Sequence, residues 1–316
     1  MFKVHSKFFD CESRVLWLKE DESANVVVVG ASSLIIHANG RIEDIRTNDG
    51  TPVAFVNGTI YMLQQGPSGI VLKISKDKEI SLPISESELY DSAIVPTSGK
   101  VYLLSSDALL QVNLNTGQVR ILGKWDARNS NYESMIVNEF YVVAYRYGFS
   151  IYEHLTSRQI YASQKRYYSF ANFLSGTELV VSDDKGNIES IELESGVQKE
   201  LAILDGRVRY IGSIKNNPLV VYKKDKVIFC GIVRNQTLIQ TSIGAFNCEA
   251  FEVINDRYLA MGTMQGVVLI WDSVTREINQ IQFNCSPRIV AMLWSEKREE
   301  LFVGTRSGKV YVCSEA

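Results

Sequence analysis

The sequence predicts an all-β protein, a single closed β-propeller, and two observations carry that prediction. A block of roughly 39 residues recurs along the whole chain. Its clearest copy, residues 249–283, contains four short apolar runs separated by polar turns. Four β-rich runs with turn residues between them, repeated at this period, are typical of propeller blades.

The copies predict eight four-stranded blades, with seven as the alternative because one weak copy can be miscounted. The second run of each copy is the easiest to see, as in "NVVVV" at residues 25–29 and "YLAM" at residues 258–261. A turn and a further β-rich run follow it. The expected blades lie near residues 13–46, 51–84, 92–123, 133–164, 169–204, 208–243, 249–283 and 289–316.

The first nine residues are expected to close the ring. The eighth copy ends with the run at residues 309–313, so it lacks an outer strand. Residues 1–9 alternate the apolar Phe2, Val4 and Phe8 with polar side chains, which is typical of a strand with one apolar face. We therefore expect residues 1–9 to pair with the last run and complete the eighth blade.

Composition predicts an ordinary soluble protein that forms one domain over residues 1–316. The chain has 46% hydrophobic and 22% charged residues and a net charge of −3. No linker or charge block interrupts the repeat, and a ring of repeats is one unit whatever its length. The small negative charge argues against DNA binding and against nonspecific binding of nucleic acid in general.

The compartment predicted by the sequence is the cytoplasm or the nucleus. Charged residues interrupt every apolar run near the N-terminus, so no signal peptide is expected, and no segment approaches the ~20 apolar residues of a membrane span. The five cysteines have no C-x-x-C spacing and fall mostly in or beside strands. Unpaired, buried cysteines indicate a reducing compartment.

The seventh copy resembles the WD40-repeat propellers. In "LAMGTMQGVVLIWD", residues 259–272, Gly262-Thr263 resembles the family's Gly-Ser/Thr and Trp271-Asp272 matches its Trp-Asp dipeptide. The resemblance implies that the hydroxyl and the indole N–H belong to one hydrogen-bonded set with a turn Asp and a loop His. Gln265 stands at the Asp position, and the chain has no Gly-His dipeptide. The period covers the full chain, whereas this motif covers one blade.

No catalytic, cofactor-binding or metal-binding residues are expected, and the protein is not expected to be an enzyme. The histidines His5, His37 and His154 fall in different blades, and no nucleotide-binding, hydrolase or zinc-protease motif occurs. Asp183-Asp184 could suggest a calcium site, but the further spaced oxygen ligands are missing. A hairpin turn between the second and third strands of the fifth blade is the preferred interpretation.

The residues most typical of a binding site are aromatic and basic residues on three connections. Successive strands of a blade alternate in direction, so these connections should emerge at one end of the ring. Trp, Tyr and Arg are enriched at binding hot spots, although Tyr at strand ends also packs between blades. The expected partner-binding residues are Trp125, Arg128, Tyr132, Tyr145, Arg146, Tyr147, Lys165, Arg166, Tyr167 and Tyr168.

The resemblance to WD40 propellers implies a non-enzymatic scaffold that docks peptides or other protein subunits within a larger complex. The absence of a catalytic constellation from the sequence supports this expectation independently. The alternative is recognition of RNA or of a phosphorylated peptide, because Tyr stacks on bases and Arg binds phosphate. A propeller enzyme with a carboxylate-bound metal in the central channel is a third class.

Overall fold

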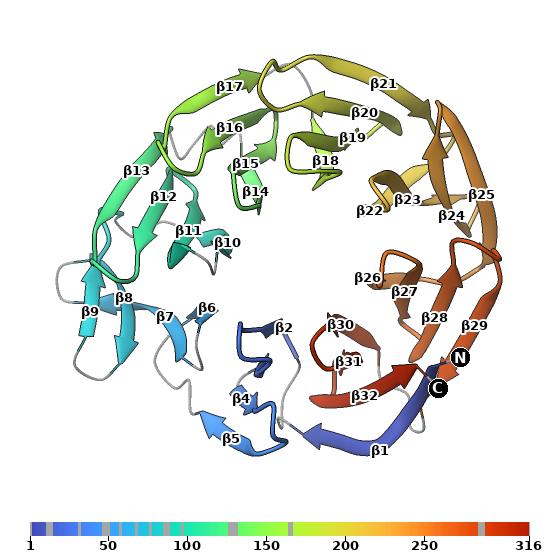
Figure 1. The fold of residues 1–316 in the computed structure, drawn as a ribbon, viewed down its shortest axis with the longest axis horizontal. Helices are drawn as coiled ribbons and strands as arrows, with labels where there is room; N and C mark the ends of the chain where they lie inside the picture. The colour runs from blue at the N-terminus through green and yellow to red at the C-terminus, as the bar shows by residue number, and fades with distance from the viewer. Residues whose placement is uncertain are drawn as a thin grey trace.

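A computed structural model describes residues 2–10, 15–30, 33–45, 51–56, 59–66, 69–75, 78–84, 89–95, 98–125, 132–163, 167–283 and 288–315. These residues form 32 β-strands in eight four-stranded antiparallel sheets, and no α-helix. The sheets are the blades of a propeller arranged around a central axis (Figure 1). The predictions of an all-β fold and of eight blades are therefore confirmed.

Each blade runs from an inner strand A at the axis to an outer strand D at the rim. Blades 1 and 2 comprise β2 (Trp17–Glu20), β3 (Val26–Val29), β4 (Ser33–Ile36), β5 (Ile42–Ile45), β6 (Thr51–Val56), β7 (Thr59–Gly66), β8 (Gly69–Ser75) and β9 (Lys78–Ser81). Blades 3 and 4 comprise β10 (Leu89–Val95), β11 (Lys100–Ser105), β12 (Ala108–Asn113), β13 (Val119–Lys124), β14 (Tyr132–Val137), β15 (Tyr141–Arg146), β16 (Phe149–Glu153) and β17 (Gln159–Ser163).

The second half of the ring has the same order. Blades 5 and 6 comprise β18 (Tyr168–Phe173), β19 (Glu178–Asp183), β20 (Asn187–Glu192), β21 (Gln198–Ile203), β22 (Arg207–Ile214), β23 (Asn217–Lys224), β24 (Val227–Arg234) and β25 (Thr237–Gly244). Blades 7 and 8 comprise β26 (Cys248–Ile254), β27 (Tyr258–Thr263), β28 (Val267–Asp272), β29 (Ile278–Gln282), β30 (Ile289–Ser295), β31 (Glu300–Thr305), β32 (Lys309–Glu315) and β1 (Phe2–Asp10).

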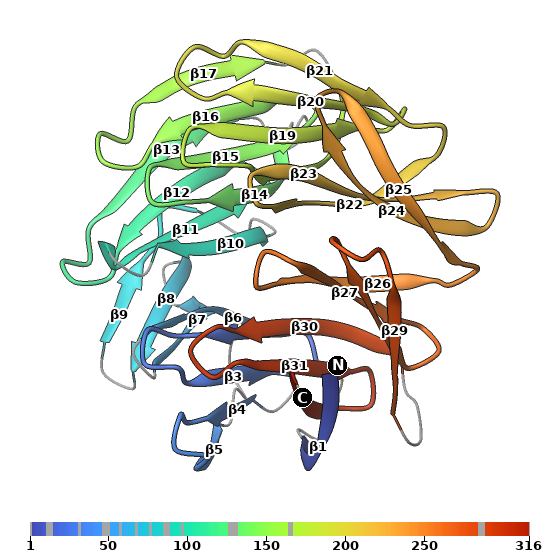
Figure 2. The same ribbon diagram turned by 45° about the vertical axis from the view of Figure 1, so that its right-hand side comes forward.

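The N-terminal strand closes the ring. β1 is the outer strand of blade 8 and pairs antiparallel with β32, from Phe2 opposite Glu315 to Asp10 opposite Lys309, with an irregularity between Val4 and Phe8. The two ends of the described chain consequently lie side by side (Figures 1 and 2). This pairing confirms the ring closure expected from the sequence.

Burial explains why the middle strands of each blade are so apolar. All six residues of β28 are buried, whereas the outer strand β21 is mostly exposed. The two faces of a middle strand both pack against neighbouring blades, so period-2 alternation gives way to continuous apolar runs. The hydrophobic core is accordingly divided into clusters, most of them lying between two adjacent blades, such as the cluster of blades 6 and 7 around Trp271.

Trp271 has a structural position between blades 6 and 7. Its side chain is 2% exposed, and its indole N–H donates to Thr241 Oγ1 of β25 across the blade interface, at 3.2 Å. The Thr263 hydroxyl instead donates to the Val267 carbonyl within its own hairpin, at 2.9 Å. The described hydrogen bonds of these two groups therefore do not form the single set that the resemblance implies.

Hydrogen bonds along the channel wall also link neighbouring blades. Glu252 Oε1 accepts the backbone N–H of Trp294 in the next blade, at 3.0 Å. Asp91 Oδ2 accepts the backbone N–H of Met135 in the same way, at 2.8 Å. Inner strands have no further strand on their axial side, so these acidic side chains satisfy backbone donors that the sheets leave unpaired.

The inner strands share a second feature, a β-bulge near one end. In seven blades the register between strands A and B skips one residue close to the start of strand A. A bulge leaves one residue unpaired, bends the strand and redirects a side chain. The skipped residues are Val53, Tyr90, Glu133, Ser169, Arg209, Glu249 and Val290.

The bulges lie at the end of the ring that carries the B–C hairpins and the D–A connections. We call this end the pocket end, because a pocket lined by residues of blades 4 to 7 opens there. The A–B and C–D hairpins form the opposite end. Asp183 belongs to the B–C hairpin between β19 and β20, where its Oδ1 accepts the N–H groups of Lys185 and Asn187, both at 2.9 Å. This is the hairpin turn expected from the sequence.

Candidate functional site

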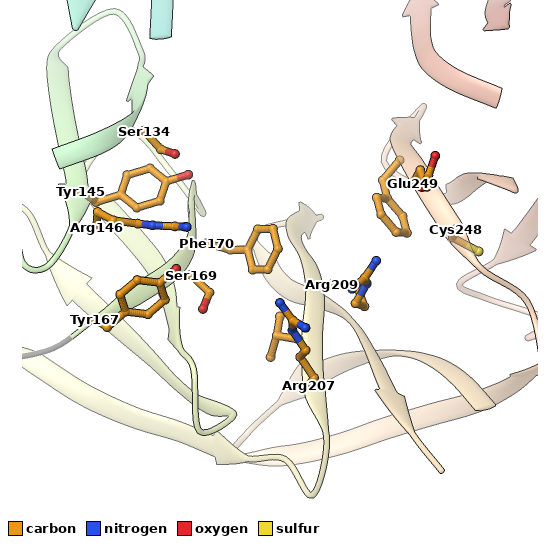
Figure 3. Close-up of a pocket in the computed structure, with 12 residues that line it drawn as sticks. Ser134, Tyr145, Arg146, Tyr167, Ser169, Phe170, Arg207, Arg209, Cys248 and Glu249 are labelled. Atoms are coloured by element: carbon orange, nitrogen blue, oxygen red, sulfur yellow. The ribbon is translucent and has the colours of Figure 1, made fainter. Parts of the chain in front are cut away.

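A pocket of about 410 Å³ opens at the pocket end of the ring, above the inner strands of blades 4 to 7 (Figure 3). It is built from residues at the first positions of β14, β18, β22 and β26, together with the end of β15. Its lining residues are Ser134, Tyr145, Arg146, Tyr167, Ser169, Phe170, Arg207, Val208, Arg209, Cys248, Glu249 and Phe251. Three of them, Ser169, Arg209 and Glu249, are bulge residues.

Arg207 and Arg209 give the pocket its positive charge. Both extend from the start of β22 into the hollow, and the buried Val208 between them anchors the strand (Figure 3). Among the described residues, neither guanidinium has a carboxylate oxygen within 4.0 Å. Two neighbouring cations without acidic partners are the main electrostatic feature of the site.

Arg146 contributes the third guanidinium, from the end of β15. It lies over the ring of Tyr167, 4.6 Å from the ring centroid, and its Nε is 3.0 Å from Glu133 Oε2. Among the described residues this buried Nε has no partner with hydrogen-bond geometry, so the pair is held by charge alone. Tyr147 packs edge-on against Tyr167, with 5.1 Å between ring centroids. Tyr167 therefore contacts both the Arg146 guanidinium and the Tyr147 ring.

Glu249 is the one acidic residue among the described residues that line the pocket, and another residue neutralises it. The Arg288 guanidinium binds both carboxylate oxygens of Glu249 through Nε and Nη2. Among the described residues, Arg288 offsets Glu249 and Glu133 offsets Arg146, so Arg207 and Arg209 leave a net charge of +2 at the pocket, whereas the whole chain carries −3. The positive charge is concentrated at this site, which favours an anionic ligand.

The remaining polar groups of the pocket are neutral donors. Burial, with a smaller contribution from the Asp91 charge, raises the pKa of Tyr145 above its ordinary value. Burial also raises the pKa of the Cys248 thiol to about 11, although the charges of Arg209 and Lys223 oppose this shift. Neither group ionises near neutral pH, so Cys248 is a buried thiol and not an activated nucleophile.

The structure brings part of the predicted site together and separates the rest. Tyr145, Arg146 and Tyr167 line the pocket, and Tyr147 stands at its edge with 51% of its surface exposed. Tyr132, Tyr145 and Tyr168 are 8% exposed or less, so these rings pack within and between blades. Trp125 is half-buried against Tyr132, with 4.9 Å between ring centroids. Arg128, Lys165 and Arg166 lie outside the described residues. The partner role of the set stays a prediction.

Sequence reasoning missed Arg207, Arg209 and Glu249. "RVR" at the start of a strand reads as an ordinary solvated strand end, and the bulge that redirects Arg209 has no local sequence signature. One signal was available: residues 209 and 249 occupy equivalent places in consecutive repeats, at the same end of the ring as Arg146. Projecting charged residues onto the repeat would have placed all three together.

The described part of the chain contains no cluster of side chains typical of a metal site. No group of three or more His, Cys, Asp and Glu side chains is close enough there to hold a metal ion. His37 interacts with Glu43 in blade 1, at 3.1 Å, and the buried His154 interacts with Tyr102 between blades 3 and 4. Whether the protein catalyses a reaction stays untested.

The fold and the pocket define a β-propeller with a cationic site at one end. No protein-family model matches the sequence, and no curated protein matches it. A computationally designed protein, Ika8, is similar with a TM-score of 0.72 and 15% identity, over 97% of this chain and 98% of that one.

A natural protein has a comparable likeness. BamB from Moraxella catarrhalis has a TM-score of 0.70 and 11% identity, and each chain is covered over 100% of its length. At these identities the likeness shows the propeller fold alone. Membership of the WD40 family is not confirmed, because no family model matches. Within the described residues, no helix is long and apolar enough to cross a lipid bilayer.

Proposed function

We propose that the protein is a non-enzymatic interaction scaffold, a propeller subunit that binds an acidic peptide segment of a partner protein in the cationic pocket. The observation that carries this proposal is the pair Arg207 and Arg209, which have no carboxylate partner among the described residues. Arg207 is exposed and Arg209 is half-buried, so both positive charges are open to a ligand. A partner carboxylate or another anion supplies the missing negative charge.

The pocket also suits a peptide in its size and in its neutral donors. A volume of about 410 Å³ lies within the usual range of ligand sites. The Ser169 hydroxyl and the exposed Tyr147 ring provide a hydrogen bond and an aromatic contact beside the charges. Arginine and tyrosine are the residue types that dominate binding energy at interfaces.

RNA recognition is favoured less. Single-stranded RNA binding needs several exposed rings on which bases stack. In the described part of the surface, Tyr147 is exposed, whereas Tyr132, Tyr145 and Tyr168 are buried.

The three buried thiols Cys230, Cys248 and Cys313 support our proposal that the protein works in a reducing compartment, the cytoplasm or the nucleus.

The test is affinity purification of tagged protein, with identification of the proteins that it retains. Three proteins are compared: the wild type, the double variant Arg207→Gln with Arg209→Gln, and a control, Arg158→Gln with Arg276→Gln. The control removes the same charge from exposed positions in the C–D turns of the opposite end. The proposal expects at least one partner that the wild type and the control retain and the pocket variant loses. Retention of every partner by a folded pocket variant would contradict it.

A further inference from the structure

The pocket places more positive charge around one hollow than a single carboxylate can neutralise. Arg207 and Arg209 come from blade 6 and Arg146 comes from blade 4, so the guanidinium groups approach from two sides (Figure 3). A carboxylate carries one negative charge and two oxygens in one plane. Binding it would offset one of the two charges of Arg207 and Arg209 and leave the other without an anionic partner.

We infer that the group recognised in this pocket is the phosphate monoester of a phosphorylated side chain in the partner peptide. This inference rests on the proposed function and names its ligand more closely. A phosphorylated side chain carries about −1.5 to −2 charges at pH 7 and three acceptor oxygens. That charge balances the pocket lining, and a tetrahedral group can accept hydrogen bonds from arginines on different blades.

The neighbouring side chains add donors to the same hollow. The hydroxyls of Ser134, Ser169 and Tyr145 line the pocket. Glu249, which would repel a phosphate, is already bound by both nitrogens of the Arg288 fork. The acid is thus neutralised by a residue outside the lining, and Arg207 and Arg209 remain available to the ligand, while Arg146 keeps its ion pair with Glu133.

The size of the pocket indicates a phosphate carried on a chain and not a free ion. Each phosphate oxygen needs about the volume of one water, ~30 Å³, so the group itself fills roughly 100 Å³. The pocket holds about 410 Å³. The remaining space accommodates the side chain that carries the phosphate and part of the adjoining backbone. Tyr167 and Phe170 provide apolar walls for it.

The experiment measures the binding of four peptides and one ion to the full-length protein by calorimetric titration. The peptides are Gly-Gly-X-Gly-Gly, where X is phosphoserine, phosphotyrosine, serine or glutamate, and the ion is inorganic phosphate. We expect one phosphopeptide to bind at least about tenfold more tightly than the glutamate peptide and than inorganic phosphate, and the serine peptide not to bind. The difference between the two phosphopeptides identifies the carrier side chain.

Two further measurements distinguish the binding of a phosphate dianion from the binding of any anion. The second pKa of a phosphate ester is about 6, so affinity for the phosphopeptide should fall severalfold between pH 7.5 and pH 5.5. Affinity for the glutamate peptide should not fall. The Arg207→Gln, Arg209→Gln variant should lose about 30-fold or more of the phosphopeptide affinity, and the Arg158→Gln, Arg276→Gln control should stay within about twofold.

Each contrary result has a distinct meaning. Equal affinity for the glutamate peptide, without pH dependence, overturns the phosphate inference and leaves the proposed acidic-peptide function standing. Inorganic phosphate binding as tightly as the phosphopeptides also overturns it, because the site would then be a free-anion site. If no probe binds, and if the pocket variant retains all partners in affinity purification, both the phosphate inference and the proposed acidic-peptide function are overturned.

Discussion

The two ends of the ring treat their arginines differently. At the opposite end, Arg257 in the A–B turn of blade 7 donates to Asp272 at the end of β28, with Nη2 2.6 Å from Oδ2. At the pocket end, Arg207 and Arg209 have no such carboxylate among the described residues. Arg257 thus fixes a turn, whereas Arg207 and Arg209 are free for the ligand that we propose.

At the opposite end, the ion pair of Arg257 and Asp272 stabilises the C–D turn of blade 7. Asp272 also accepts the backbone N–H groups of Val274 and Thr275, at 2.7 and 3.3 Å, in the C–D turn. Burial alone would raise the pKa of Asp272, but the bonds from Arg257 and from the two N–H groups hold it below its ordinary value. The carboxylate is therefore fully engaged in local structure, and substitutions here should affect stability and leave ligand binding unchanged.

The largest effect is expected from opening the ring, because both ends depend on its closure. Deleting residues 1–10 removes β1 and leaves the edge of β32 unpaired. An exposed, apolar edge strand promotes association between chains. We expect aggregation, or a loss of about 5 kcal/mol or more of the free energy of unfolding. Size-exclusion chromatography and thermal melting check this. A monomeric truncated protein with an unchanged melting temperature would show that the closing strand is dispensable.

The next largest effect is expected from Trp271→Ala, which should lower stability without changing ligand binding. Trp271 is 2% exposed and bridges blades 6 and 7 near the opposite end. Trp271→Ala should lower the free energy of unfolding by about 3–5 kcal/mol, the usual range for a buried aromatic residue. Denaturant titration measures it, and phosphopeptide affinity of the remaining folded protein should not change. If stability were normal and partners were lost, Trp271 would instead be a binding residue.

The channel wall between the ends provides a pH-dependent test. Burial raises the pKa of Glu252 to about 7, against the smaller opposing effect of the Trp294 N–H. The folded protein thus binds this proton more tightly than the unfolded chain does. The contribution of protonated Glu252 to the free energy of unfolding is fully present below the ordinary pKa of 4.5 and declines as the pH rises toward 7.

Glu252→Gln removes this decline, because the amide oxygen can still accept the Trp294 N–H and carries no charge. The variant should be more stable than the wild type by about 1–3 kcal/mol at pH 8, and the difference should shrink toward pH 5. Denaturant titrations at the two pH values check this. A difference that does not depend on pH would mean that the Glu252 carboxyl ionises normally in the folded protein.

The blades and their closure were predictable from the sequence because they follow from local patterns. Apolar runs such as "NVVVV", separated by turns, recur at a fixed period, and Phe2, Val4 and Phe8 mark a strand that no other blade uses. Each blade contacts only its two neighbours, so the pattern of apolar runs within one repeat is enough to predict its strands and their burial. The WD40-like motif of Trp271-Asp272, in contrast, lies at one blade interface, and no family model confirms the resemblance.

The candidate site was only partly predictable because it is assembled across blades. Strand direction alone predicted that the two connections carrying Arg146 and Tyr167 share one end of the ring, and the structure has the pocket at that end. Burial of Tyr132 and Tyr168 depends on how closely adjacent blades pack, which no single repeat specifies. The exposure of Arg209 depends on a bulge, and bulges arise from the register between two strands.

The smallest expected effect gives the most direct test of the difference between the ends. The free energy of unfolding is measured at low salt for the wild type, for Arg207→Gln with Arg209→Gln, and for Arg257→Gln. The two pocket arginines repel each other and have no carboxylate partner among the described residues, so their double variant should be as stable as the wild type, within about 0.5 kcal/mol, or more stable. Arg257→Gln should be less stable than the wild type. The opposite order, with a loss of more than about 1 kcal/mol in the pocket variant and none in Arg257→Gln, would mean that the pocket arginines support the fold and are not reserved for a ligand.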